Sequence, residues 1–317
     1  MRRLSASIVD ALSVDVEGFV ESNAESFGRR VPTEHGPTDR REIERNMAAV
    51  FQLLDDLAVR ATMFFLETVA VSLPGLVGQA AELGHEVACH GDRHERLSGR
   101  GRDDLRVGLR RAKGRLEDLA GAPVLGFRAP EFSITRSNLW ALDLLGELGF
   151  AYDSSVYPIG VHDVYGIAGA PRFPHRLANG MIEFPLSTVG VLGRRVPVAG
   201  GGYVRFAPRA LTEQAVRRIH REGHPANVFL HPYELGPAAP RVGGLSTARR
   251  LRHYHGLRTG PRKLRAMSAR FRLGPVHTSL EAAGHALDSG GEKVSPAERR
   301  NRTSPSSPLA GDVTTRA

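Results

Sequence analysis

The sequence has almost no cysteine and no long apolar run near its start. Its single cysteine, Cys89, cannot form an internal disulfide, so a disulfide framework is excluded. Polar residues such as Asp10 and Ser13 interrupt the apolar stretches of the N-terminal region. The sequence therefore predicts neither a signal peptide nor a membrane span there, and we expect a cytoplasmic protein.

Acidic residues are missing between Arg241 and Leu280. This stretch contains ten Lys or Arg residues, and the formal net charge of the whole chain is +9, so the remainder is close to neutral. We predict a basic helical segment over residues 241–272, suited to anionic lipid heads, a pyrophosphate-linked substrate or nucleic acid. The alternative is a solvated helix whose arginines pair with acids elsewhere on the domain.

Nucleic acid is the least favoured of these partners. The chain carries no helix-turn-helix, zinc-finger or RNA-binding signature, and the basic segment has few aromatic residues, namely Tyr254 and Phe271. We expect no nucleic-acid partner, and we favour peripheral contact with an anionic membrane, in particular through Arg262 and Lys263.

Strand-like and helical patterns alternate along most of the chain. Short apolar runs predict strands at residues 8–16, 61–66, 86–90, 125–128, 150–153, 181–186 and 227–231. Helical periodicity predicts helices at residues 39–59, 76–83, 103–119, 137–148 and 208–221. Seven strands with intervening helices indicate an α/β barrel, in which reacting groups collect at the carboxyl ends of the strands.

The composition divides the chain at about residue 280. Residues 1–280 carry the alternating pattern and form one domain, with the basic extension beginning at about residue 241. Residues 281–317 are predicted to be a disordered tail, because residues 288–317 are rich in Ser, Thr, Pro, Gly and Arg and have few large apolar groups.

Two short stretches have the residue types of a metal centre. Asp15 and Glu17 lie two residues apart in a predicted strand, so both carboxylates face the same side. His90 is the last residue of the third predicted strand and His94 follows it, and two imidazoles with one carboxylate would leave open positions on a Zn²⁺ ion. Each pair has a plainer interpretation as polar residues of a strand or loop. Strand alternation turns Cys89 away from His90 and into the core.

Five motifs occur in an order that is typical of one family. SVDVE at residues 13–17, HGDRH at 90–94, GFRAPEFSIT at 126–135, DSSVYP at 153–158 and FLHPYE at 229–234 resemble the polysaccharide deacetylases, the NodB-homology group or carbohydrate esterase family 4. FPLSTV at 184–189, GGGYVRF at 200–206, RHYHGL at 252–257 and FRLGP at 271–275 resemble its subgroup linked to exosortase exopolysaccharide clusters.

The resemblance implies a role for each matching residue. Glu17, His90 and His94 would hold a divalent metal, with Zn²⁺ the expected ion. Asp15 would be the general base for the attacking water, and His231 the general acid for the leaving amine. The positioning roles fall to Arg128, which would orient Asp15, and Asp153, which would hold and tune His231. An amide N–H near Glu131 would stabilise the oxyanion, and Glu131, Phe132 and Tyr203 would contact substrate.

The implied protein is a metal-dependent hydrolase in a distorted seven-stranded (β/α) barrel. It would remove N-acetyl groups from N-acetylhexosamine residues of a polysaccharide or its lipid-linked precursor in exopolysaccharide biosynthesis. The alternatives are an O-acetyl esterase, a small-amide hydrolase and a non-catalytic glycan-binding protein. Plainer roles also stay open for three residues: Arg128 as a structural ion pair, Asp153 as a turn cap and His231 as a core histidine.

The chain departs from the family pattern in its first motif. Many relatives have two adjacent aspartates there, whereas Val16 separates Asp15 from Glu17 in this sequence. Gly18 and Phe19 stand where the subgroup usually has Asp and Tyr. The alternation of a strand keeps both carboxylates on one face, so we expect these departures to change substrate contacts more than catalysis.

Overall fold

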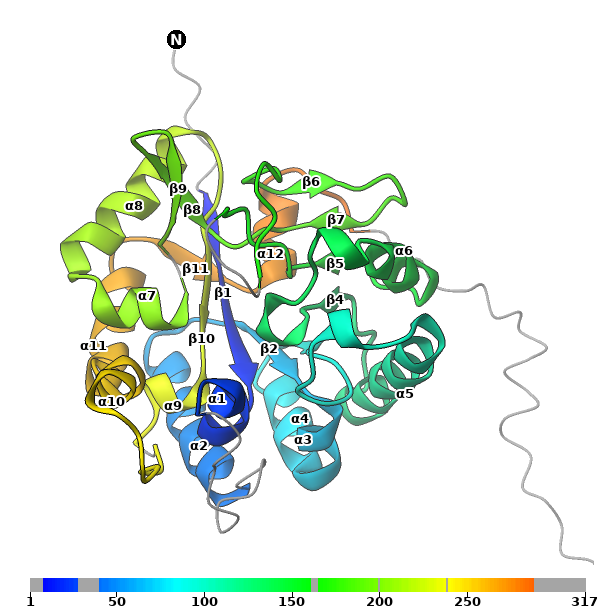
Figure 1. Cartoon of the computed structure of the whole chain (residues 1–317), viewed down its shortest axis with the longest axis horizontal. Helices are drawn as coiled ribbons and strands as arrows, with labels where there is room; N and C mark the ends of the chain where they lie inside the picture. Colours follow the sequence, from blue (N-terminus) through cyan, green and yellow to red (C-terminus); the bar gives the residue numbers. More distant parts are fainter. Residues whose placement is uncertain (1–7, 28–39, 161–164, 199, 238, 288–317) are drawn as a thin grey trace, which may run out of the picture.

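The computed structural model describes residues 8–27, 40–160, 165–198, 200–237 and 239–287. Its main sheet has nine strands in the order β10-β1-β2-β3-β4-β5-β7-β6, with β11 paired to the start of β1. All its pairs are parallel except β6 with β7. The strands follow an arc with helices outside it (Figure 1).

The seven predicted strands are all present. They are β1 (Val9–Val16), β2 (Thr62–Phe65), β3 (Glu86–Cys89), β4 (Gly126–Phe127), β5 (Tyr152–Asp153), β7 (Ile182–Glu183) and β10 (Asn227–Leu230). Every residue of β1 is buried, as expected for a central strand of a parallel sheet covered on both faces. The predicted α/β class is therefore confirmed, in the form of a curled half-barrel.

The sheet is open in the described residues, because no strand pair joins β10 to β7. Side-chain hydrogen bonds cross this gap instead. The Asn227 amide donates to the carbonyls of Phe184 and Pro185, and the Asn227 backbone N–H donates to Ser187 Oγ over 2.7 Å. Polar side chains thus close the barrel where the backbone ladder stops.

The predicted helices are also present, with small shifts at their ends. They are α2 (Arg40–Asp56), α4 (Pro74–Glu82), α5 (Arg102–Ala120), α6 (Trp140–Glu147) and α8 (Arg209–Arg221). Asp39, the predicted first residue of α2, lies outside the described residues. The apolar stripe of α2 packs on the sheet through residues such as Ile43, Met47 and Leu54.

The sequence patterns missed the short elements. These are α1 (Phe19–Phe27), α3 (Glu67–Ser72), α7 (Gly201–Phe206), α9 (Pro232–Leu235), α12 (Val276–Ala282), β6 (His175–Arg176), β8 (Thr188–Val191), β9 (Arg194–Pro197) and β11 (Arg272–Gly274), together with four 3₁₀ turns, η2 (Leu97–Gly99), η3 (Pro130–Phe132), η4 (Arg136–Asn138) and η5 (Leu257–Thr259). Most are too short to show a clear period. The predicted basic helical segment contains two helices, α10 (Thr247–Tyr254) and α11 (Gly260–Ser268).

The basic segment is part of the domain, not an appended helix. It folds as α10 and α11, and it then enters the sheet as β11, which pairs with Val9–Ala11 of β1. Lys263 Nζ donates to three carbonyls at the end of α7, and Arg265 pairs with Asp56 over 2.8 Å. The prediction of helices was confirmed, but several of these cations serve the fold.

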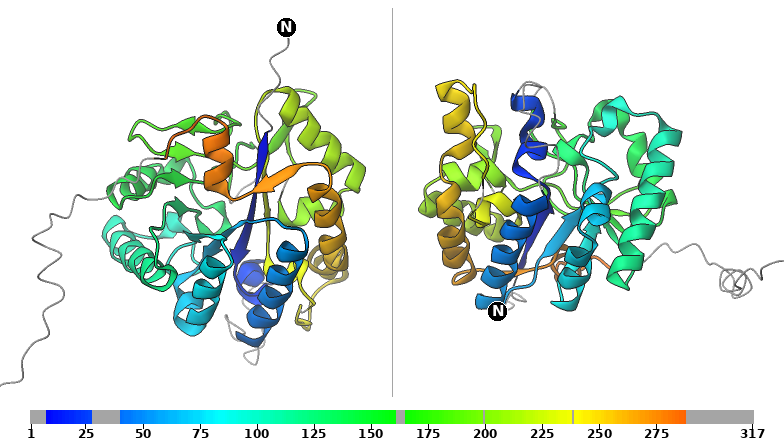
Figure 2. Two further views of the ribbon diagram at one scale, coloured as in Figure 1. Left: turned by 180° about the vertical axis from the view of Figure 1, so that it is seen from behind. Right: turned by 90° about the horizontal axis from the view of Figure 1, so that it is seen from below.

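The half-barrel is filled in layers from its amino-terminal end. The lowest layer is apolar: α12 packs through Val276 and Leu280 against Ala11 and Phe64, and Figure 2 (left) shows β11 and α12 beside the start of β1. Alternate inward residues of β1 then become polar, at Ser13 and Asp15. The interior therefore turns from hydrophobic to ionic toward the carboxyl ends of the strands.

Residues 281–287 belong to the folded domain, contrary to the prediction of a tail from residue 281. Helix α12 ends at Ala282, and Leu287 still packs against the apolar inner layer. Residues 288–317 lie outside the described residues. Among the described helices, none has the length and apolar character that crossing a bilayer requires.

Candidate metal centre and catalytic cavity

Three predicted ligands meet at the carboxyl ends of β1 and β3. Glu17 Oε2 lies 3.0 Å from His94 Nε2 and 3.4 Å from His90 Nε2. Glu17 and His90 are buried, and one ligand atom from each of the three residues lies within 4.8 Å of the others. Of the His, Cys, Asp and Glu residues that the structure describes, only these three form such a group.

The chemistry of this donor set fits a divalent cation. Glu17 Oε2 is buried and has no hydrogen-bond partner among the described residues, which is costly unless a cation meets it. His90 Nδ1 lies 2.8 Å from the carbonyl oxygen of Arg128, and an Nδ1–H donor there leaves the Nε2 lone pair directed at the site. Two imidazoles and one carboxylate leave open positions for water and substrate.

Protonation of His94 responds strongly to Glu17. Burial alone would lower the pKa of His94, but the Glu17 carboxylate raises it to about 9. The pKa of Glu17 is held well below its usual range: burial opposes the charge, and the histidines around it more than offset that effect. A cation at these atoms would replace the shared protons, so its binding should release protons.

Arg128 holds Asp15, as predicted. Arg128 Nη1 donates to Asp15 Oδ1 and to Ser13 Oγ, each over 2.7 Å. Its other nitrogens donate to the carbonyl and hydroxyl of Ser154, and its guanidinium lies 4.2 Å from the centre of the Phe64 ring. Arg128 is fully buried, so these contacts fix the position of the Asp15 carboxylate beside the metal ligands.

His231 also reaches the centre, but through a different partner from the one predicted. His231 Nε2 lies 3.3 Å from Glu17 Oε1, while His231 Nδ1 lies 3.0 Å from Glu234 Oε2. Glu234 Oε1 accepts a hydrogen bond from Arg205 Nε over 2.6 Å. Arg205 in turn donates to the carbonyl of His253, which lies within α10, and to that of His255, which follows the helix. A buried chain of charges therefore orients this imidazole.

The prediction that Asp153 holds His231 is wrong. The Asp153 carboxylate accepts hydrogen bonds from the backbone N–H and the hydroxyl of Ser155, which is the turn-capping role left open above. Its charge also lies beside Glu183, whose pKa is raised well above its usual range by burial and by Asp153. The short side chain of Asp153 is committed to this turn, and Glu234 occupies the position that the prediction gave to it.

The pKa of His231 is raised well above its usual value. Burial opposes the charged form, but the anionic partners Glu17 and Glu234 stabilise it, with a contribution from Tyr233. A protonated imidazole that points Nε2 into the centre can donate a proton there. This is the property that the general-acid role requires.

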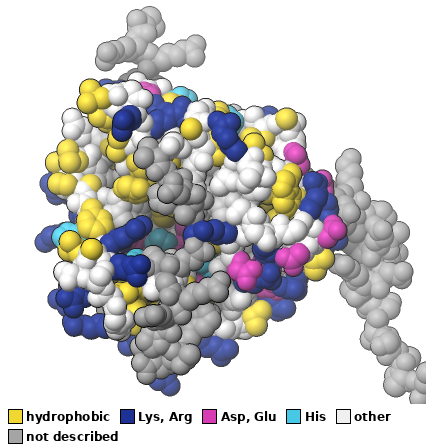
Figure 3. All heavy atoms as spheres, in the orientation of Figure 1, with side chains coloured by type: hydrophobic (Ala, Val, Ile, Leu, Met, Phe, Trp, Pro, Cys, Tyr) yellow, Lys and Arg dark blue, Asp and Glu magenta, His cyan; other side chains and the backbone are white. Residues whose placement is uncertain are grey.

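The centre opens into a cavity of about 570 Å³. Its lining includes seven of the predicted site residues besides Glu17, namely Asp15, His90, His94, Glu131, Phe132, Tyr203 and His231. Figure 3 shows histidine and acidic side chains in a hollow near the middle of one face, with Lys and Arg on both sides. Arg128 lies beneath Asp15, and Asp153 is not among the lining residues.

The predicted substrate residues form the wall of this cavity. Glu131 pairs with Arg96 over 2.7 Å, and both Glu131 and Phe132 have φ near +52°, a strained conformation for residues other than glycine. Phe132 packs edge-on against Tyr157 and Phe229. Its own N–H donates to the Ala129 carbonyl, which leaves the Glu131 N–H as the candidate oxyanion donor. Tyr203 lies at the mouth and is 38 % exposed.

Sequence patterns missed three further features of the site. Glu21 is buried, and burial together with the charge of Glu17 raises its pKa to about 7. Arg205 and Glu234 lie in motifs but have no predicted role. A histidine directly before a helix with an acid three residues later nevertheless resembles a capping box. Gly200 contacts the Phe229 ring so closely that an added Cβ would lie 1.7 Å from it.

Two family profiles match the chain. The profile "Polysaccharide deacetylase" matches residues 34–150, and "Domain of unknown function (DUF3473)" matches residues 154–281. The chain therefore carries a polysaccharide deacetylase domain over residues 34–150. Its first matched region carries the two ligand histidines and Arg128, and its second carries Arg205, His231 and Glu234. A comparison with curated proteins gave no match.

Solved structures share the fold across most of the chain. A proposed polysaccharide deacetylase from Mycobacterium smegmatis has 18% identity and a TM-score of 0.53, covering 97% of this chain and 98% of its own. The allantoinase Puue has 15% identity and a TM-score of 0.55, covering 89% of this chain and 91% of its own. The polysaccharide deacetylase domain supports a hydrolase with deacetylase activity in general, and deacetylases of this family are metal-dependent.

Proposed function

We propose that the protein is a metal-dependent N-deacetylase that removes acetyl groups from N-acetylhexosamine residues of a glycan. The observation that carries this proposal is the meeting of Glu17, His90 and His94 around a buried, unpartnered carboxylate oxygen, with Asp15 and His231 beside them. A base, an acid and a cation site in one cavity match what amide hydrolysis needs.

Each residue has a distinct task in this reaction. A divalent cation held by Glu17, His90 and His94, with Zn²⁺ the ion we propose, would polarise the acetyl carbonyl and acidify water. Asp15, fixed by Arg128, accepts the proton of the attacking water. The N–H of Glu131 stabilises the oxyanion.

The leaving amine takes its proton from His231 Nε2. An amine is a poor leaving group unless it is protonated as the carbon–nitrogen bond breaks, so the reaction needs an acid on its side of the cavity. The Glu234 carboxylate holds the proton of Nδ1, which keeps the imidazole charged and directs Nε2 into the cavity. Arg205 balances the charge of Glu234 in turn.

The substrate that we propose is a polysaccharide or its lipid-linked precursor in exopolysaccharide biosynthesis. The cavity wall of Phe132, Tyr157 and Tyr203 offers aromatic faces to a sugar ring. We also propose a cytoplasmic location with peripheral contact to an anionic membrane. The exposed arginines of α10 support this contact, because Arg249, Arg250 and Arg252 lie on a helix without acids, beside the cavity mouth.

A second candidate keeps the fold and changes the bond that is cleaved. The structural similarity to an allantoinase favours a small-amide hydrolase as this alternative, and an O-acetyl esterase would use the same base and cation site. Esters have better leaving groups, so an esterase would depend less on His231. A non-catalytic glycan-binding protein would have no use for the ordered acid and base.

The experiment that tests the proposal measures acetate release from N-acetylglucosamine oligomers by the wild type, Asp15→Asn and His231→Ala. We expect release by the wild type and a large loss in both variants. Loss in Asp15→Asn with little change in His231→Ala would favour the esterase. Release that survives both substitutions would overturn the assigned mechanism.

A further inference from the structure

A second, larger cavity lies at the opposite end of the half-barrel. It has a volume of about 990 Å³ and is bounded by α8, by β11 and the turn before it, by α12 and by the start of β1. Val9 lines it, whereas Glu17 of the metal centre follows the other end of β1. Eight residues at about 3.3 Å each separate the two sites by on the order of 25 Å.

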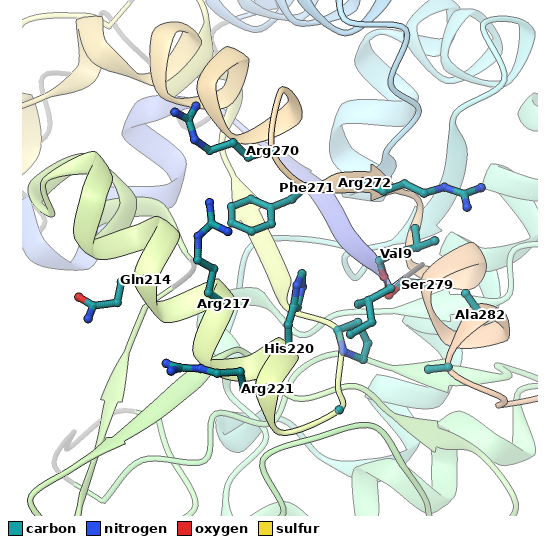
Figure 4. Close-up of a pocket in the computed structure, with 14 residues that line it drawn as sticks. Val9, Gln214, Arg217, His220, Arg221, Arg270, Phe271, Arg272, Ser279 and Ala282 are labelled. Atoms are coloured by element: carbon teal, nitrogen blue, oxygen red, sulfur yellow. Dashed lines mark hydrogen bonds between the residues drawn. The ribbon is translucent and has the colours of Figure 1, made fainter. Parts of the chain in front are cut away.

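Four arginines and one histidine line this cavity, and none of the described residues that line it is acidic. We name it the arginine cavity, after Arg217, Arg221, Arg270 and Arg272. In Figure 4, Arg217 and His220 rise from α8 toward Phe271, and the guanidinium groups of Arg221 and Arg270 lie on the α8 side of that ring. The guanidinium groups of Arg221, Arg270 and Arg272 point in different directions around the cavity, and that of Arg217 lies nearest to the Phe271 ring.

Neighbouring carboxylates balance only some of the positive charges of the arginine cavity. Arg270 pairs with Glu213 over 3.1 Å, and His220 Nε2 lies 2.8 Å from Asp10 Oδ1. The guanidinium groups of Arg217 and Arg221 have no carboxylate partner within the described residues. The guanidinium carbon of Arg217 lies 5.5 Å from the centre of the Phe271 ring. Arg217 and Arg221 are both exposed, so at least two cations are left for an anion from solution.

Apart from Gln214 and Ser279, the remaining lining is apolar or glycine. Val9, Pro225, Phe271, Ala282 and Ala283 form this part, and Phe271 is itself buried. The volume is at the upper end of that of small-molecule sites and is much larger than a bare oxyanion needs. A ligand that satisfies both surfaces has an anionic group for the arginines and an apolar group for the floor.

We propose that the arginine cavity binds a phosphate ester, with its phosphoryl group on Arg217 and Arg221 and its organic group against Phe271. Guanidinium forks match the oxygens of a phosphoryl group bidentately, and a dianion balances two arginines. The ester can be a free metabolite or the headgroup of an anionic lipid. The proposal is independent of the deacetylase reaction, since the two sites share no residue.

The test is calorimetric titration of the full chain with phenyl phosphate, which combines both features of the ligand. The double variant Arg217→Gln/Arg221→Gln should bind it at least about tenfold more weakly, because two charge-assisted hydrogen-bonding groups are lost. The matched control is Arg41→Gln/Arg110→Gln, which removes two exposed arginines of α2 and α5 without side-chain partners in the described residues. It should change binding by less than about twofold.

Three further comparisons make the outcome decisive. Phenol should not bind measurably, and inorganic phosphate should bind more weakly than phenyl phosphate because it leaves the apolar floor exposed. Sedimentation with phosphatidic acid vesicles then distinguishes the sources: a specific loss in Arg217→Gln/Arg221→Gln assigns a lipid headgroup, and equal sedimentation of both double variants assigns a free ester. Acetate release and melting temperature should be the same in both double variants.

The proposal is overturned by any of three results. These are equal weakening of phenyl phosphate binding in both double variants, undiminished binding in Arg217→Gln/Arg221→Gln, and no binding to the wild type at concentrations up to about 10 mM, where even weak ionic sites fill.

Discussion

Glu234 Oε2 lies 3.0 Å from His231 Nδ1, three residues along the same turn, and its other oxygen is held by Arg205. The same Glu234 oxygen accepts the backbone N–H of His231 over 2.9 Å, so it fixes both the residue and its ring. A local capping contact thus orients His231, the proposed general acid. The region matched by the domain of unknown function supplies all three residues.

Replacing Glu234 with Gln should slow deacetylation more than it weakens substrate binding. The amide keeps the size of the side chain but removes the charge that holds the His231 proton, so we expect kcat to fall about 10- to 100-fold with little change in KM. Steady-state kinetics on an N-acetylated oligosaccharide measure this. On an activated ester the loss should be smaller, because a good leaving group needs no acid.

The matched control is Asp153→Asn, which should change kcat by less than about threefold. The Asn carbonyl can still accept the Ser155 N–H, its amide can donate to the Ser155 hydroxyl, and Asp153 does not contact His231. If Asp153→Asn and Glu234→Gln had the reverse ranking on the amide substrate, the original assignment of Asp153 would be restored.

Replacing Arg128 with Lys should destabilise the fold as well as reduce activity. A lysine cannot reach Ser13, Asp15 and Ser154 at the same time, and it leaves buried acceptors unpaired. We expect the free energy of unfolding to drop by about 3 kcal/mol or more in urea titrations. The surface substitution Arg102→Lys, at an exposed pair with Glu147, should cost less than about 0.5 kcal/mol. Equal effects would show that the buried geometry of Arg128 is unimportant.

Substitution of either ligand histidine should weaken metal binding. His90→Ala and His94→Ala each remove one of three ligands, so we expect the affinity for Zn²⁺ to fall by at least about 100-fold, more than the loss of an outer-shell contact. Competition with a chromophoric chelator gives the affinities.

Cys89→Ala serves as the control and should bind the ion as the wild type does. Cys89 is packed in the core with Val87, and burial raises its pKa to about 12, so it does not offer a thiolate. A Cys89→Ala protein that lost the ion would make this cysteine a ligand.

His85 should make stability fall as the pH drops from about 6.5 to 4. Its ring is buried against Phe51, its Nδ1 accepts the Ala61 N–H over 3.3 Å, and burial lowers its pKa from 6.5 to about 4. In this window the unfolded state binds the proton and the folded state does not, so acid favours unfolding. The contribution is fully present above pH 6.5.

His85→Asn should flatten this part of the pH dependence. The Asn carbonyl can replace Nδ1 as the acceptor without titrating. Urea unfolding of both proteins between pH 4 and 7 measures the difference. Parallel stability curves would mean that His85 is protonated equally in both states.

Long periodic elements and the motif residues could be predicted from the sequence, for physical reasons. Strand alternation places Asp15 and Glu17 on one face, and the ends of parallel strands meet, so β1 and β3 bring Glu17 to His90 and His94. The apolar residues of α2 recur at helical spacing over nearly five turns, so the sequence alone indicates this helix. In these cases local pattern and global fold agree.

The features of the fold and the site that the sequence does not predict depend mostly on contacts between distant segments. No local pattern shows that β11 returns to the start of β1, because a three-residue strand has no measurable period. The resemblance implies that Asp153 is the partner of His231, whereas Glu234, three residues after His231 on the same turn, makes this contact. The sequence predicts a basic helical segment over residues 241–272, but it does not reveal that Lys263 donates to the carbonyls at the end of α7.

The most direct test of the central claim measures metal content and acetate release on the same preparation. The purified protein is assayed with N-acetylglucosamine oligomers before chelation, after chelation and after Zn²⁺ is returned. The account predicts about one divalent ion per chain, with acetate release that stops on chelation and returns with Zn²⁺. Acetate release that continues at full rate in a preparation shown to be free of metal would contradict it.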